Sequence, residues 1–149
     1  MVALLLPCAM IVVIDTNVFI SACLGTGAAG VIIAHCLRGA LKPLMGAALF
    51  AEYEDVLARD SLFVKSRLNR LEREELLEIF LSTCRWTQVF YGWRPNLRDE
   101  GDNHLIELAV AGSARCVVTS NIKDFREAEL NFPGLRIITP ANLVQEIGI

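Results

Sequence analysis

The sequence predicts an α/β protein, a three-layer α/β/α sandwich around a central, mainly parallel sheet. Short apolar runs rich in β-branched residues, the first at residues 11–14, are typical of strands that are buried on both faces. Segments with apolar residues at helical spacing separate these runs. Hydrophobic residues make up 54% of the chain, which is enough apolar surface to cover both faces of a sheet. Strands joined through helices pair in parallel by right-handed crossovers.

The first half of the chain is expected to contribute two strands and two helices. Glycines at positions 25, 27 and 30 loosen the chain after the first strand. Between Leu49 and Leu57, apolar residues recur at the spacing of a helix that buries one face. The expected elements are, in order, a strand over 11–14, a helix that ends near Arg38, a strand over 41–45 and a helix that opens at Gly46.

The second half repeats this alternation. Residues 69–84 combine leucines at helical spacing with many glutamates and predict an amphipathic helix. Another helix is expected to start at Asp102 and to close at Gly112, because glycine often follows the last helical turn. Thr139 before Pro140 has the pattern of an N-cap followed by proline in the first turn of a terminal helix. The remaining expected elements are strands over 86–91, 116–119 and 135–138.

The length of 149 residues fits a single domain, and the chain has no repeat and no linker rich in glycine, proline or serine. Met10 stands directly before the first strand, so we expect residues 1–9 to be either an N-terminal extension of that domain or the result of a misassigned start, with Met10 as the true first residue. This apolar start carries no Lys or Arg, and Asp15 interrupts it at about half a membrane span, which argues against a secretory signal or a membrane helix. Five widely spaced cysteines without a C-x-x-C pair indicate small core residues in a reducing cytoplasm.

The charge distribution limits the possible partners. A net charge of −3 argues against wide electrostatic coverage of a nucleic-acid backbone, but it is compatible with a small, metal-assisted contact. Basic residues gather between Arg59 and Arg73, and we interpret this run as a solvated helix surface. We interpret the aromatic stretch 85–94 as core and dimer-facing packing.

Carboxylates occur at four places in the chain, each at a predicted strand end or helix. In parallel sheets, ligands bind beyond the carboxyl ends of the strands, so the first and last of these places are expected to share one edge. Carboxylates within about 4 Å repel by several kcal/mol per pair, and a cation is needed to keep them ionised together. Hard oxygen ligands select Mg²⁺ or Mn²⁺. The places are Asp15; Glu52 with Glu54 and Asp55; Asp99 with Glu100 and Asp102; and Asp124 near Asn121.

Four stretches in this order resemble the PIN-domain ribonucleases, and in particular the PIN-family toxin components of bacterial toxin-antitoxin systems. The stretches are "VVIDTNVFIS", "AEYEDVLAR", "RDEGDNHLIELAVAGSARCVVTSN" and "TSNIKDF", and "ITPANLV" follows near the end. The resemblance covers residues 10 to about 147. Each stretch is a weak signal alone, but the ordered set is specific.

The resemblance implies a set of site residues. Asp15, Glu52 and Asp102 map to acidic positions of the family that bind metal and carry catalysis, and Asn17 is the neighbouring polar residue of the first motif. Many relatives have aspartate where this chain has Asn121, so the fourth acid is either absent or supplied by Asp124. The implied supporting residues are Asn17, Asp99, Thr119 and Asn121, and the residues expected to contact RNA are Arg94, Arg98 and His104.

The function that the resemblance implies is a Mg²⁺- or Mn²⁺-dependent endoribonuclease that cuts single-stranded RNA with a metal-activated water. It would act as a cytoplasmic toxin, as a homodimer, and a small antitoxin would neutralise it.

Other interpretations stay open from the residues alone. Asp15 with Asn17 is also the pattern of a turn or helix cap, and Asp102 and Asp124 are well placed to cap helices. A PIN domain that has lost catalysis and binds RNA or protein is a further candidate, because Asn121 replaces an acid. A phosphatase similar to the haloacid dehalogenases would need an aspartate two residues after Asp15, where this chain has Asn17.

Overall fold

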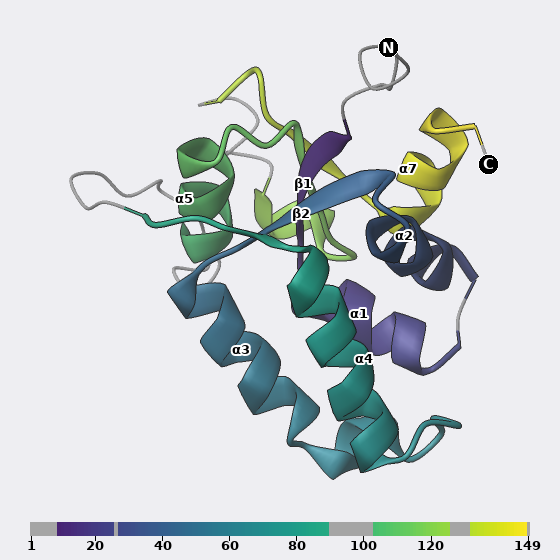
Figure 1. The fold of residues 1–149 in the computed structure, drawn as a ribbon. Coiled ribbons are helices and arrows are strands. Elements are labelled where there is room, and N and C mark those ends of the chain that lie inside the picture. The colour runs from purple at the N-terminus through teal and green to yellow at the C-terminus, as the bar shows by residue number, and fades with distance from the viewer. Residues whose placement is uncertain (1–8, 26, 90–102, 126–131, 149) are drawn as a thin grey trace, which may run out of the picture.

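The structure is a computed structural model, and it describes residues 9–25, 27–89, 103–125 and 132–148. In this part of the chain, five strands form one sheet in the order β3-β2-β1-β4-β5, and all neighbours are parallel (Figure 1). The predicted α/β class with a parallel central sheet is therefore confirmed. The strands are β1 (Met10–Ile14), β2 (Leu41–Met45), β3 (Arg85–Trp86), β4 (Cys116–Val118) and β5 (Arg136–Ile138).

Helices cover both sides of this sheet. Helix α5 packs against β1, β2 and β4, while α2 packs against β2 and α7, and Figure 1 shows these two groups on opposite sides of β1 and β2. The sandwich therefore has the three layers that the sequence predicts. The helices are α1 (Thr16–Cys23), α2 (Gly27–Leu37), α3 (Ala47–Leu57), α4 (Arg70–Thr83), α5 (Asn103–Ala111) and α7 (Pro140–Glu146), with short 3₁₀ turns η2 (Asp60–Phe63) and η4 (Ile122–Phe125).

Strand β1 lies at the centre of the sheet because its side chains are apolar on both faces. Val12, Val13 and Ile14 are buried, and β1 pairs with β2 on one side and β4 on the other. The Asp15 N–H continues the ladder by donating to Val118 O at 3.0 Å. The central strand thus delivers Asp15 to the carboxyl edge of the sheet.

Helix α1 directly follows β1, although the sequence predicted no helix before residue 25. Val18, Phe19 and Cys23 turn inward and are buried, and the Phe19 ring packs against Tyr53 and Phe80 with centroids 5.5 and 5.3 Å away. Burial against distant aromatic residues stabilises this short helix. Its own sequence carries only a weak signal, because β-branched residues and an adjacent glycine cluster oppose helix formation.

The interpretation of stretch 85–94 as core packing is wrong for Trp86. Up to residue 89, where this described segment ends, the expected strand over 86–91 is represented by the two-residue edge strand β3, and 55% of Trp86 is exposed. Its ring makes an edge contact with Phe50, at 5.5 Å between centroids. Residues 90–94 lie outside the described part of the chain, so the dimer-facing part of this expectation stays a prediction.

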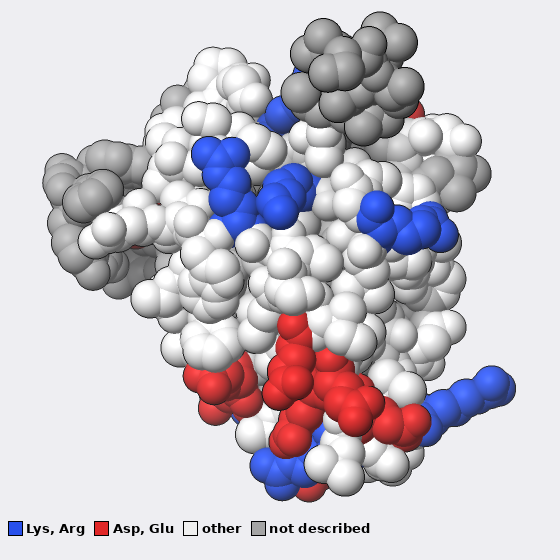
Figure 2. Space-filling view, viewed as in Figure 1, with Lys and Arg blue, Asp and Glu red and all other residues white. Residues whose placement is uncertain are grey.

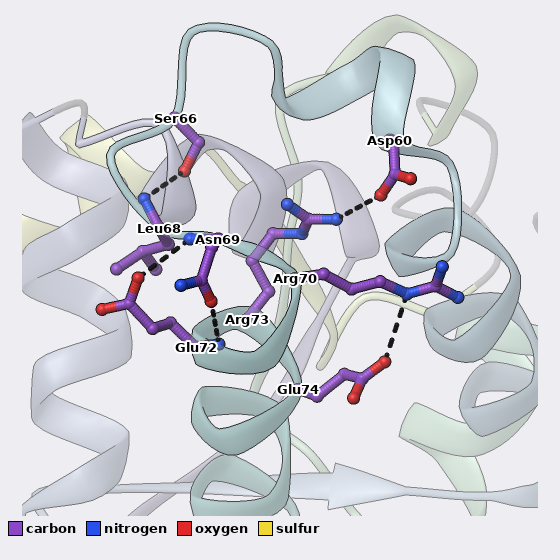
Figure 3. Close-up of polar contacts among 8 residues, drawn as sticks. All are labelled: Asp60, Ser66, Leu68, Asn69, Arg70, Glu72, Arg73 and Glu74. Atoms are coloured by element: carbon purple, nitrogen blue, oxygen red, sulfur yellow. Dashed lines mark hydrogen bonds and ion pairs between the residues drawn. The ribbon is translucent and has the colours of Figure 1, made fainter.

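Helix α4 begins where the sequence predicts it, and Figure 3 shows its first turn. Asn69 accepts from the Glu72 N–H at 2.9 Å while Glu72 accepts from the Asn69 N–H at 2.9 Å, a reciprocal capping box. Arg73 departs from the predicted solvated run because it is only 4% exposed. Its guanidinium donates to Asp60 at 2.8 Å (Figure 3). The same group lies 4.2 Å from the centre of the Phe63 ring. Arg73 thus ties η2 to α4.

The cysteines of the described chain are core residues, as predicted. Cys23, Cys36, Cys84 and Cys116 are buried free thiols, and Cys8 lies outside the described residues. Burial raises the pKa of Cys36 and Cys84 to about 12 and of Cys23 and Cys116 to about 11, so the reactive thiolate is scarce at neutral pH.

Charged side chains are unevenly distributed on the surface. Figure 2 shows acidic side chains gathered over α3 and α4, with Lys and Arg side chains in the upper half of the same view and a few others at its lower edge. Glu54, Glu74 and Glu78 line a shared groove between these two helices. Arg70 lines the same groove, but the three carboxylates outnumber it, so this groove is not expected to attract a phosphate backbone. Within the described residues, α1 and α2 reach a membrane-spanning length only when taken together, and no single helix does.

Candidate functional site

Asp15 is the centre of a network of polar side chains. It is 5% exposed, and its Oδ2 accepts from Thr119 Oγ1 at 2.8 Å and from Asn17 Nδ2 at 3.1 Å. Although Asp15 occupies the N-cap position of α1, its side chain makes no capping hydrogen bond. Helix capping therefore does not explain why an aspartate stands at this buried position.

The parallel sheet brings Asp15 and Thr119 together across 104 residues of sequence. Neighbouring strands β1 and β4 end at the same edge, and Thr119 continues the ladder by donating its N–H to Ile138 O at 3.0 Å. Asn17, in the first turn of α1, connects this helix to the chain just after β4. Its Nδ2 lies 3.3 Å from Thr119 Oγ1, and its Oδ1 accepts from the Ser120 N–H at 3.2 Å. The Asn121 N–H donates to Thr119 Oγ1 at 3.1 Å.

Glu52 joins this network from helix α3 through a threonine hydroxyl. Thr16 Oγ1 lies 3.4 Å from Glu52 Oε1 and 3.5 Å from Asp15 Oδ1, so it sits between the two carboxylates. The neighbouring Tyr53 fixes the helix, because its buried hydroxyl donates to Ile14 O at 2.8 Å. A single turn of α3 is thereby anchored to the end of β1, which places Glu52 beside Asp15.

His104 approaches Glu52 from the first turn of α5. His104 Nε2 lies 2.9 Å from Glu52 Oε2, close enough for an ion pair when the imidazole is protonated. The contact lacks the alignment of a hydrogen bond, and Glu52 Oε2 and His104 Nδ1 are buried without hydrogen-bond partners, as is Oδ1 of the adjacent Asn103. Buried polar atoms without partners are uncommon in folded proteins, and one explanation for them is a bound ion or ligand.

The electrostatics of the site disfavour the ionised form of Asp15. Burial is the main cause that raises the pKa of this carboxyl, and the nearby Glu52 charge raises it further. The Thr119 hydroxyl, the Thr16 backbone N–H and His104 oppose the change and lower the pKa, but the net direction is upward from the ordinary 3.8. A cation between the two carboxylates would remove their repulsion and favour the ionised form.

The structure brings together Asp15, Asn17, Glu52, His104 and Thr119 of the residues predicted for the site. Four others lie outside the described residues, namely Arg94, Arg98, Asp99 and Asp102.

The two candidates for the fourth acidic position lie at η4. Asn121 is exposed, and the half-buried Asp124 is in η4, where its N–H donates to Asn121 O at 3.2 Å. Within the described chain, no hydrogen bond or ion pair joins the side chain of either residue to Asp15 or Glu52. The described residues also contain no group of three His, Cys, Asp or Glu arranged to hold a metal ion. The role of Asp124 stays a prediction.

Sequence reasoning missed two residues of this region. Thr16 bridges the two carboxylates, and its place inside the D-T-N motif is a signal that points to it. Asn103 is buried with an unpartnered oxygen, and only its position next to Asp102 hints at a role.

Comparisons with known proteins identify the family and support the fold. The family model described as "PIN domain" matches residues 11–123, from β1 into η4. Among solved structures, VapBC2 from Rickettsia felis bound to a DNA fragment from their promoter is similar, with a TM-score of 0.53 and 16% identity over 87% of this chain and 98% of that chain. PAE2754 from Pyrobaculum aerophilum gives a TM-score of 0.52 and 15% identity over 93% of this chain and 89% of that chain. At these identities the two structures support the fold.

No curated protein sequence matches the chain significantly. The family model nevertheless spans most of the sequence and includes the strand ends that carry Asp15 and Thr119. On this match, the chain belongs to the PIN-domain family.

Proposed function

We propose that this protein is a metal-dependent endoribonuclease that cuts single-stranded RNA. PIN domains are generally nucleases, and the chain belongs to that family. The observation that carries the proposal is the buried Asp15, held by Thr119 and Asn17 and linked through Thr16 to Glu52. A carboxylate with a raised pKa beside a second carboxylate is costly for a structural role alone, and such arrangements cluster at functional sites.

The donor set fits Mg²⁺ or Mn²⁺. Asp15 and Glu52 supply carboxylate oxygens, and Mg²⁺ is usually bound in proteins by only one or two carboxylates. We propose that Asp15, Glu52 and Asp102 hold the metal and that Asp124 is the fourth acid, with Asp99 and Asn121 in support. A bound divalent cation at this place polarises a phosphodiester and lowers the pKa of a water molecule.

The residues of the chain itself have positioning roles in this proposal. Thr119 and Asn17 direct hydrogen bonds at Asp15 Oδ2, which hold the carboxylate in one orientation. His104 restrains the Glu52 carboxylate through the contact between its Nε2 and Glu52 Oε2. When protonated, its imidazole offers a positive charge beside the site for an RNA phosphate. Arg94 and Arg98 are proposed as further RNA contacts.

We also propose a toxin role with a small antitoxin as partner. The structurally similar VapBC2 from Rickettsia felis is bound to a DNA fragment from their promoter, and this supports a partner of that kind. A homodimer and a cytoplasmic location complete the proposal.

Cleavage by the purified protein tests the catalytic proposal. Wild-type protein is expected to cut 5′-labelled single-stranded RNA with Mn²⁺ and to stop when a chelator is added. Asp15→Asn is expected to lower the rate by at least about 100-fold, because it removes a charge that holds the metal at the reacting phosphate. Glu54→Gln is the matched control, since Glu54 is an exposed carboxylate on the same helix as Glu52.

Calorimetry with Mn²⁺ separates the remaining interpretations. Binding by wild type and weaker binding by Asp15→Asn support the nuclease. RNA binding without detectable metal binding favours a PIN domain that has lost catalysis, for which Asn121 is the specific support. Equal cleavage by wild type and Asp15→Asn would refute the assignment. A phosphatase mechanism lacks a proton donor, because Asn17 is an amide engaged with Asp15 and Thr119.

A further inference from the structure

A cavity of about 520 Å³ adjoins the acidic site on the side of α5. It lies between the first turn of α3, the chain just after β3 and the first turn of α5, and Ala48, Thr87 and Asn103 are part of its lining. His104 belongs to both places, because it lines the cavity and its Nε2 lies 2.9 Å from Glu52 Oε2. A ligand in the cavity is therefore next to the carboxylates.

Two residues that line the cavity carry buried polar atoms without a hydrogen-bond partner in the described chain. Asn103 is 4% exposed, and its Oδ1 has no hydrogen-bond partner, and neither does Nδ1 of His104. Leaving a buried polar group unpaired costs about 1–3 kcal/mol. The first N–H groups of α3 face the same region, and their N-cap residue Gly46 has no side chain to accept from them. Residues with unpaired hydrogen-bond donors and acceptors therefore line the same cavity.

The remaining lining favours a ligand with apolar surface and without negative charge. Leu49, Val89 and Leu108 supply apolar surface, and Ala48 leaves open space beside them. Glu107 also lines the cavity and disfavours a phosphate group. A nucleobase combines apolar faces with an edge of donors and acceptors, and a volume of this size falls within the range of small-molecule sites. An asparagine amide pairs with a base edge through one donor and one acceptor.

We infer that this cavity receives one unstacked base of a single-stranded RNA and that Asn103 hydrogen-bonds to its edge. Proteins read single-stranded RNA by this kind of base capture. The base would belong to a nucleotide next to the phosphate held at Asp15 and Glu52, which makes the cavity the place where the cleavage site is selected. This last step rests on the proposed nuclease function, whereas base binding by itself does not.

Titration with nucleoside 5′-monophosphates tests base binding without cleavage. The four monophosphates of adenosine, guanosine, cytidine and uridine are added to ¹⁵N-labelled full-length protein in the presence of a chelator. At least one is expected to shift the Asn103 side-chain amide and the Ala48 backbone N–H, with a dissociation constant in the millimolar range, roughly −4 kcal/mol. Shifts confined to the loops around Asp15 and Thr119, or no shifts at all, would overturn the inference.

A variant whose new side chain fills the cavity tests the same inference. Asn103 is buried and its replacement risks unfolding, whereas Ala48 is exposed at the cavity and tolerates Ala48→Phe. This variant is expected to weaken monophosphate binding at least about 10-fold, since each 1.4 kcal/mol corresponds to a factor of ten. Ala111→Phe, at an exposed alanine at the end of α5 that does not line the cavity, is expected to bind like wild type. Equal loss in both variants would contradict a specific pocket.

RNA cleavage then separates failure of this inference from failure of the proposed function. Monophosphate binding that Ala48→Phe abolishes, in a protein that cuts no RNA, supports the pocket and refutes the nuclease. Cleavage by Ala48→Phe with the base preference of wild type leaves the nuclease in place and refutes the pocket. Cleavage in which Ala48→Phe loses that base preference supports both.

Discussion

Replacing Thr119 with valine removes the hydroxyl that holds the Asp15 carboxylate and leaves the side-chain shape nearly unchanged. Thr119 is fully buried, and its Oγ1 donates to Asp15 Oδ2 at 2.8 Å. The same oxygen accepts from the Asn121 N–H at 3.1 Å and lies 3.3 Å from Asn17 Nδ2. Asn17 is half-buried and Asn121 is exposed, so water can replace the lost hydroxyl for their N–H groups, whereas Asp15 is buried. The main effect of Thr119→Val therefore falls on the buried carboxylate.

The expected cost depends on the charge of Asp15. A hydrogen bond to a charged group contributes about 1.5–3 kcal/mol, so we expect Thr119→Val to lower the free energy of unfolding by about 2–3 kcal/mol when Asp15 is ionised. With a protonated carboxyl, the lost bond is between neutral groups and the expected cost is about 1 kcal/mol. A larger cost when Asp15 is ionised than when it is protonated indicates that the Thr119 hydroxyl mainly stabilises the charged carboxylate.

The sign of the pH dependence follows from the direction of the pKa change. Burial raises the pKa of Asp15 above its ordinary 3.8, so the folded protein binds this proton more tightly than the unfolded chain. The resulting stability is present below the unfolded pKa and is lost as pH rises through the folded pKa. Thr119 limits this loss because its hydrogen bond lowers the pKa. In Thr119→Val the pKa of Asp15 rises further, and the loss becomes larger and extends to higher pH.

Urea denaturation in a chelating buffer at about pH 4 and about pH 8 measures this effect. Thr119→Ser keeps the hydroxyl and is the control, with an expected loss below about 1 kcal/mol from its missing methyl group. In the Asp15→Asn background, the pH dependence of the Thr119→Val effect should disappear. A Thr119→Val effect that is the same at both pH values, or below about 0.5 kcal/mol at the higher one, would refute the reasoning.

Two further predictions concern the scaffold that positions the site. Gly112→Ala is expected to cost about 1–3 kcal/mol of unfolding free energy, because a Cβ at this position would meet Leu44 Cδ1 at 2.3 Å and Leu44 is buried in the core. Gly134→Ala is the control in the same urea titration, since a Cβ there meets nothing within 4 Å, and a similar loss in both variants would contradict the steric argument. Asn69→Ala is expected to cost about 1 kcal/mol by removing the capping box of α4, whereas Asn69→Asp keeps the acceptor and most of the stability. Equal stability of Asn69→Ala and wild type would show that α4 does not depend on this cap.

The sequence predicts best those elements whose determining residues lie within a few positions of one another. Helix α4 starts after Asn69 as expected, because the capping box and the helical spacing lie within a few residues of each other. Strand β2 agrees with its expected range of 41–45. The burial of Arg73 was not predicted, since its partners Asp60 and Phe63 precede it by more than two helical turns and meet it only in the folded chain.

The sequence by itself determined the fold class and the central carboxylate of the site. An apolar strand that ends in Asp15 implies a buried strand in a parallel sheet, because only such a strand is covered on both faces. The motifs also identified Asn17, Glu52 and Thr119, which the structure brings to one edge of the sheet.

Only the tertiary structure decided how these residues meet and what lies beside them. Thr16 bridges Asp15 and Glu52 because Tyr53 anchors α3 to the end of β1, a contact between positions 39 residues apart. The cavity that contains Asn103 exists only where α3, α5 and the chain after β3 converge. Such features depend on long-range packing, which the spacing of residues along the chain does not record.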